Sequence, residues 1–221
     1  METAMNLILV VAVLTSLALL GSSRLLSSIA LIGWQGAFLG LLPLVAAHHS
    51  FWQPEWRLIV LAIVGIGLKG IFFPWFLRRS MVQADVRQDS LPFLGYGASM
   101  VAGITLTAIS FWLAQGLLLP AELRRVSPLV LPAALSLILM GLLLIVSRRT
   151  ALMQTVGYLL MENGIYVFGV ALAHEEPFLV EMGVLLDVFV AVFVMGITVF
   201  HISREFDHTY TDQLSELRDF E

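Results

Sequence analysis

The chain is built from apolar runs that are each long enough to cross a lipid bilayer. Crossing ~30 Å of hydrocarbon takes roughly 17–25 residues of helix, because a helix rises only about 1.5 Å per residue. Short polar or proline-bearing segments separate seven such runs. The sequence therefore predicts an all-α, polytopic integral membrane protein with about seven transmembrane helices. The predicted spans are 5–22, 29–47, 55–77, 91–117, 127–146, 150–173 and 177–203.

Composition supports the same fold class and excludes several kinds of site. The 221 residues are 59% hydrophobic and 13% charged, with a mean hydropathy of +0.92, whereas soluble domains are about 45–50% apolar and about 25% charged. There is no cysteine, which excludes disulfides, thiolate zinc sites and iron–sulfur ligation. The net charge of −4 offers no basic surface for nucleic acid. We expect no catalytic centre, metal or cofactor in this chain.

The distribution of arginine predicts how the chain is oriented in the membrane. Residues 1–203 are expected to form one transmembrane helical domain, and residues 204–221 an acidic cytoplasmic tail. The first apolar run lacks a basic segment before it, so we interpret it as a retained helix and not a signal peptide. Eight arginines fall on one side of the seven spans and three on the other, which places the N-terminus outside and the C-terminus in the cytoplasm. The richer side carries Arg24, Arg78, Arg79, Arg87, Arg148, Arg149, Arg204 and Arg218, and the other Arg57, Arg124 and Arg125.

Three ionisable residues lie deep inside predicted spans. Lys69, the only lysine, is roughly 20 Å into the third span, and Glu162 is at a similar depth in the sixth. Asp187 lies about ten residues into the seventh. A charge at the bilayer centre costs at least ~2.5–3.5 kcal/mol, so such groups usually face a bundle interior, a partner or water. Glu181 and His201, nearer the ends of the seventh span, are further candidates for a proton route.

The neighbours of these residues suit a hydrated or closely packed interior. Burial in a low dielectric disfavours the charged form of an ionisable group, so an unpaired buried group can exchange a proton near neutral pH; lysine can do this whereas arginine retains its proton. Pro74 is predicted to kink the third span at Gly70, four residues earlier. Asn163 adds an amide that can bond across helices.

Glycines predict close helix contacts around the same groups. Gly65, Gly67 and Gly70 surround Lys69 in the sequence, and Gly157 and Gly164 flank Glu162 in the manner of small-residue membrane interfaces. The alternative interpretation remains open at this stage: a buried carboxylate can be a structural partner that fixes how helices pack.

Several segments together resemble a known family. "LKGIFFP", "GYLLMENG" and "LVEMGVLLDVFVAVFVM" are similar to the E membrane subunit of hydrogenase-4-type complexes, which are group 4 [NiFe] hydrogenases and formate hydrogenlyases. The part at 127–203 also resembles the K subunit of complex I and the C subunit of multi-subunit cation/proton antiporters. That second family has two membrane glutamates; Asp187 falls on the second, while Leu159 stands at the first. Glu162 lies three residues later, on nearly the same helix face.

The resemblance implies a membrane-arm subunit of a respiratory, hydrogenase-type or complex I-like assembly in the prokaryotic cytoplasmic (inner) membrane. It implies a lateral proton path that includes Glu162, Asp187 and Lys69, and partners that comprise antiporter-like subunits and a peripheral hydrogenase-type arm. The nickel–iron site and iron–sulfur clusters are expected in those partners, so the chain would be a non-catalytic subunit of an oxidoreductase complex. Two alternatives are a subunit of a multi-subunit cation/proton antiporter and a purely structural scaffold.

Overall fold

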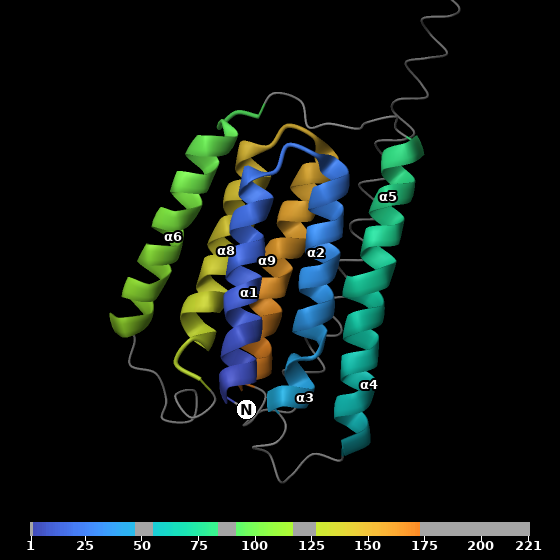
Figure 1. Ribbon diagram of the computed structural model, residues 1–221, viewed down its shortest axis with the longest axis vertical. Helices are drawn as coiled ribbons and strands as arrows, with labels where there is room; N and C mark the ends of the chain where they lie inside the picture. Colours follow the sequence, from blue (N-terminus) through green and yellow to red (C-terminus); the bar gives the residue numbers. More distant parts are fainter. Residues whose placement is uncertain (1, 47–54, 84–91, 117–126, 173–221) are drawn as a thin grey trace, which may run out of the picture.

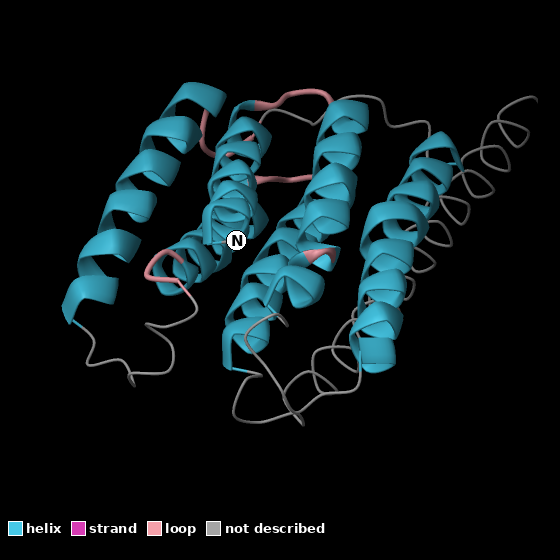
Figure 2. Cartoon of the chain, turned by 60° about the horizontal axis from the view of Figure 1, so that its bottom comes forward, coloured by secondary structure: helices cyan, strands magenta, loops and turns pink. Residues whose placement is uncertain are grey.

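The structure is a computed structural model that describes residues 2–46, 55–83, 92–116 and 127–172. Within these ranges the secondary structure is helical, and short loops connect the helices (Figures 1 and 2). The elements in chain order are α1 Glu2–Gly21, α2 Leu25–Gly40, α3 Leu42–Ala46, α4 Glu55–Gly65, η2 Ile66–Phe72, α5 Phe73–Gln83, α6 Tyr96–Gly116, α8 Val130–Ser147 and α9 Ala151–Leu172.

The predicted all-α membrane architecture is confirmed in the described part of the chain. Four helical stretches there are long and apolar enough to cross a membrane: Thr3–Gly21, Leu25–Val45, Tyr96–Gly116 and Val130–Ser147. The third predicted span corresponds to α4, η2 and α5, which follow one another along one rod (Figure 1), and the sixth corresponds to α9. The seventh predicted span, 177–203, lies outside the described residues.

The second span differs from its prediction at both ends. The segment 21–28 is predicted to be a break, but α2 begins at Leu25, because Leu25 and Ile29 are both fully buried and extend the packed face of the helix. The turn between α1 and α2 is thus only a few residues long. At the other end α2 stops at Gly40, and the short helix α3 follows after Leu41.

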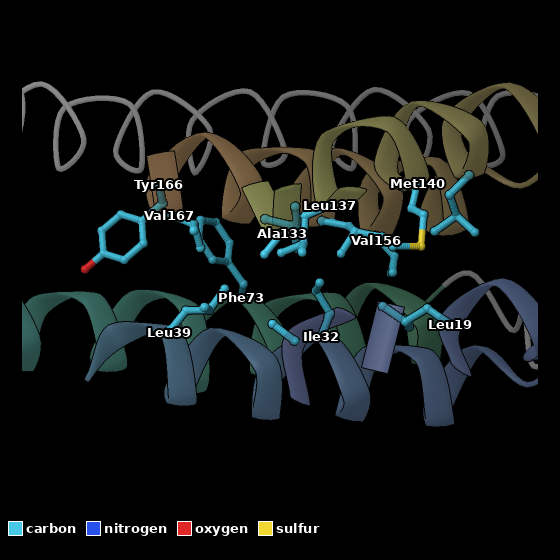
Figure 3. Packing of buried hydrophobic residues seen from close by; sticks show 14 of the residues in the cluster. Leu19, Ile32, Leu39, Phe73, Ala133, Leu137, Met140, Val156, Tyr166 and Val167 are labelled. Atoms are coloured by element: carbon cyan, nitrogen blue, oxygen red, sulfur yellow. The ribbon is translucent and has the colours of Figure 1, made fainter. Parts of the chain in front are cut away.

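The helices form a bundle with α1, α2, α8 and α9 at its centre. The α8–α9 pair packs against α1 and α2, while α6 lies at one edge beside α8 and α1, and α4, η2 and α5 lie at the other beside α2 (Figure 1). Figure 3 shows the layer where the two sides meet, with Leu137 of α8 facing Ile32 of α2 and Met140 of α8 facing Leu19 of α1. The exposed apolar side chains of α6, among them Trp112, match a lipid-facing surface.

Glycines allow α8 and α9 to pack backbone against backbone, as the sequence predicts for Gly157 and Gly164. A Cβ added at Gly157 would lie 2.9 Å from the main-chain nitrogen of Ile145, and one added at Gly164 would lie 2.8 Å from the carbonyl oxygen of Ala134. Gly141 of α8 is as tight, since its Cβ would lie 2.5 Å from the main-chain nitrogen of Met161. Such small-residue contacts are typical of membrane helices.

Arg148 is buried, although it sits in the short α8–α9 connection, which the sequence predicts to be a polar break between two spans. The arginine is 0% exposed. Its Nη2 donates a hydrogen bond to the carbonyl oxygen of Leu20 at 2.5 Å, and its guanidinium lies over the ring of Tyr96, 4.6 Å from the ring centroid. Leu20 is in the last turn of α1, where carbonyl groups lack helical partners and the helix dipole favours a cation. Arg148 therefore links the end of α1 to the connection between α8 and α9.

Candidate functional site

An ion pair lies in the interior of the bundle and joins η2 to α9. Lys69 Nζ lies 2.5 Å from Glu162 Oε1, and the two residues are only 3% and 2% exposed. The expectation that these two residues face protein is confirmed. The sequence places both at a similar depth, but it does not determine whether they meet; the fold brings them into direct contact. The attraction between opposite charges at this distance offsets part of the cost of removing each from water.

Two further side chains of α9 surround the lysine head group. The ring of Tyr166 lies under Nζ at 4.0 Å from its centroid, which is the geometry of a cation–π contact. Asn163 Oδ1 accepts a longer hydrogen bond from Nζ at 3.4 Å. Asn163 thus bonds across helices, as the sequence predicts, and Tyr166 contacts the cation directly.

Hydrogen bonds extend this polar cluster into α1 and α2, which the sequence does not predict. Asn163 Nδ2 donates to Gln35 Oε1 at 3.5 Å, and Gln35 Nε2 donates to the carbonyl oxygen of Ala12 at 2.8 Å and to Ser16 Oγ at 2.9 Å. Gln35 and Ser16 are 1% and 0% exposed. One signal could have found Gln35: it is the only amide side chain in the predicted span 29–47, and a buried amide needs partners.

The backbone around Lys69 explains how the lysine fits so close to α2. Residues Ile66–Phe72 form a π-helix, and the N–H of Phe73 bonds to the carbonyl of Leu68, five residues back. The disruption predicted at Pro74 therefore takes the form of a wider helical turn before the proline; π-helical segments often occur at functional sites. Opposite it, Gly36 of α2 leaves space for the lysine, because a Cβ at Gly36 would lie 2.6 Å from Lys69 Cβ.

Of the three glycines near Lys69, one, Gly70, has the predicted role of close packing. A Cβ at Gly70 would lie 3.0 Å from Ala37 Cβ of α2, and Gly65 faces Gly40 of α2 and the Tyr166 hydroxyl at ordinary contact distances. Gly67 has nothing within 4 Å of where its Cβ would be. The space that these glycines provide is filled mainly by α2.

Comparison with known proteins identifies the kind of subunit. The model of the NADH-ubiquinone/plastoquinone oxidoreductase chain 4L family matches residues 129–219. Uncharacterized protein Rv0085 of Mycobacterium tuberculosis is 31% identical over 210 residues, which cover 94% of this chain and 92% of that protein. Hydrogenase-4 component E of Escherichia coli is 40% identical over 102 residues, which cover 45% of this chain and 46% of that protein. The chain belongs to the same family as Rv0085, and parts of it are similar to chain 4L and to hydrogenase-4 component E.

The two residues of the ion pair lie on different sides of the boundary of the segment that matches chain 4L. Glu162 lies inside the segment that matches chain 4L, whereas Lys69 lies outside it. The alignment with hydrogenase-4 component E spans less than half of that protein's length, and the protein of the same name from Shigella flexneri aligns to the same extent. No solved structure matches the chain at a comparable significance.

Of the other residues predicted for the site, one lies within the described residues and three lie outside them. Pro74 lies buried at the start of α5, where its ring approaches Gly33 of α2. Asp187, Glu181 and His201 lie outside the described residues, so their proximity to the pair stays a prediction. Within the described residues there is no group of three or more His, Cys, Asp or Glu side chains that could hold a metal ion.

Proposed function

We propose that this protein is a membrane-arm subunit of a hydrogenase-type or complex I-like assembly, in which Lys69 and Glu162 form one link of a lateral proton path. Its relation to chain 4L and to hydrogenase-4 component E supports the membrane-arm role. The observation that carries the proton path is the direct contact of the lysine with the carboxylate in the bundle interior, because membrane-embedded ionisable residues are rare and mark ion pathways.

The contact permits a simple proton exchange. The proton moves from Lys69 Nζ to the Glu162 carboxylate, so that one N–H bond breaks, one O–H bond forms, and a neutral amine faces a neutral acid. Both forms of the pair carry no net charge, which makes their exchange compatible with a low dielectric. The ionic form is restored when the Lys69 amine gains a proton from one neighbouring group and the Glu162 acid loses its proton to the next.

The proposed path continues beyond the pair into residues and subunits that supply the driving force. Asp187 is the next proposed link along the chain, with Glu181 and His201 as further members. The nickel–iron site and the iron–sulfur clusters belong, in this proposal, to a peripheral arm, and antiporter-like subunits lie alongside in the inner membrane. The proposed orientation has the N-terminus outside and the C-terminus in the cytoplasm.

Glu162→Gln tests the path, because glutamine retains the shape and hydrogen-bonding capacity of the side chain but cannot ionise. The purified complex should contain its full set of subunits yet pump fewer protons per turnover in reconstituted vesicles. Arg149→Gln, which removes an exposed charge at the end of the bundle, is the matched control and should pump normally. Wild-type stoichiometry in a fully assembled Glu162→Gln complex would remove Glu162 from the path.

The tightness of the pair favours a second candidate function, that of a structural lock between η2 and α9. Lys69 and Glu162 lie within hydrogen-bond distance and are both almost fully buried, as expected of an ion pair that fixes helix packing. The double variant Lys69→Met with Glu162→Gln separates the two functions. A lock replaced by a neutral contact should still allow coupled activity, whereas a proton link should not.

A further inference from the structure

We propose that Gln35 and Ser16 are positioning residues for the ion pair, which orient the Asn163 amide so that its oxygen faces Lys69. The proposal deepens the proposed function and rests on it for the functional meaning of Lys69. The three residues form a line that runs from α1 through α2 to α9 and ends at the lysine head group.

The orientation of Gln35 follows from a main-chain carbonyl. A carbonyl oxygen only accepts hydrogen bonds, so the atom of Gln35 that lies 2.8 Å from the Ala12 carbonyl must be the amide nitrogen. Its second N–H reaches Ser16 Oγ at 2.9 Å, while the Ser16 hydroxyl itself donates to the Ala12 carbonyl at 2.7 Å. Both N–H groups of Gln35 are thereby directed to α1, and its oxygen is directed to α9.

The oxygen of Gln35 in turn decides the orientation of Asn163. It accepts from Asn163 at 3.5 Å, which requires the nitrogen of Asn163 on that side. Asn163 Oδ1 is then left for Lys69 Nζ at 3.4 Å. An asparagine amide on its own can be turned either way; here one carbonyl on α1 sets the polarity of the whole line.

The consequence is that the described groups around the lysine nitrogen all accept from it. They are the Glu162 carboxylate, the Asn163 oxygen and the face of the Tyr166 ring, all from α9. Amides neither gain nor lose a proton near neutral pH. The Ser16–Gln35–Asn163 line therefore holds the lysine head group in place, and the proton exchanges through Glu162.

The single lysine of the chain makes this arrangement directly observable. Isotope labelling of lysine side-chain nitrogen in the full chain, reconstituted in lipid bilayers, gives one solid-state NMR resonance, that of Lys69. Gln35→Met keeps the length of the side chain and removes both the donor and the acceptor, so the resonance should shift as Asn163 turns. Asn163→Leu should also shift it, and the double variant should match Asn163→Leu alone, because Gln35 acts through Asn163.

A purely structural role for Gln35 predicts a different result. Such a role would lower the unfolding midpoint and leave the lysine resonance in place, and an unchanged resonance in Gln35→Met would overturn the proposal. Shifts that simply add in the double variant would do the same. None of these measurements depends on proton pumping, so the positioning role can be tested whether or not the Glu162→Gln experiment supports the proton path.

Ser16→Ala gives a second, milder variant in case Gln35→Met does not fold. It removes one of the two acceptors of Gln35 and leaves the Ala12 carbonyl, so the resonance should shift less than in Gln35→Met. Ser110→Ala is the matched control, since Ser110 is a buried serine of α6 whose hydroxyl bonds to the Leu106 carbonyl of its own helix. Identical lysine spectra for Ser16→Ala and Ser110→Ala would contradict the proposal.

Discussion

Two helix contacts in this bundle use glycine to bring backbones together and then place different chemistry in the contact. At α8–α9, glycines on both helices face main-chain atoms, and the surrounding side chains are apolar. At α2–η2, Gly36 faces the base of Lys69, whose head group forms the buried ion pair with Glu162 of α9. Close packing is thus a property of both contacts, whereas the second also positions a buried charged residue.

The largest loss of stability is expected when one residue of the ion pair is replaced and the other remains. Lys69→Met leaves the Glu162 carboxylate buried without its cation, and removal of one member of a buried pair costs ~3–5 kcal/mol. The unfolding midpoint in detergent should fall steeply, and the double variant with Glu162→Gln should recover part of the loss. A double variant that is as unstable as the sum of the single ones would show that the two residues do not compensate each other.

Gly141→Ala should give the next largest loss, without any direct effect on the ion pair. The new Cβ would lie within 2.5–2.8 Å of main-chain atoms of Gly157 and Met161, and these atoms cannot move aside without separating the helices. Overpacking of this kind costs typically ~1–3 kcal/mol. Gly97→Ala, where nothing lies within 4 Å, is the control and should unfold at a midpoint close to that of the wild type.

Gly36→Ala should cost less stability than Gly141→Ala but disturb the site more. The new Cβ would lie 2.6 Å from Lys69 Cβ and 3.1 Å from two main-chain atoms of Lys69, so the relief is a shift of η2 that carries the lysine with it. The Lys69 resonance in lipid bilayers should move further in this variant than in Gly141→Ala, whose new Cβ contacts α9 and not the lysine itself. Equal shifts in the two variants would erase the distinction between the two contacts.

Gly65→Ala should have the smallest effect and the opposite sign. Gly65 has helical angles, with φ −60° and ψ −48°, and a Cβ there would meet its neighbours no closer than 3.5 Å. Replacement of glycine by alanine at such a site stabilises by about 0.4–1 kcal/mol, chiefly by restricting the unfolded chain. A lower unfolding midpoint than wild type would show that Gly65 contributes to the contact with Gly40 of α2.

Helix positions were predictable because a bilayer imposes a length and an apolar composition on every span. The depth of Lys69 and Glu162 followed from the same rule, since the rise per residue converts a position in a span into a distance along it. The differences are local. The helix α2 begins earlier than predicted, because the polar residues before it hide the packing of Leu25, and the burial of Arg148 is not evident from its place in a short polar connection.

The sequence by itself determined that the chain crosses a membrane with few charges inside it, because every unpaired charge there is costly and stands out. Only the tertiary structure decided that Lys69 contacts Glu162, and that Gln35 and Ser16 extend the cluster. Uncharged polar residues cost less in an apolar span than charges do, so their pattern gives a weak signal. Which residues meet depends on how each helix is rotated about its axis, and contacts such as Gly36 against Lys69 fix that rotation only when the helices are packed.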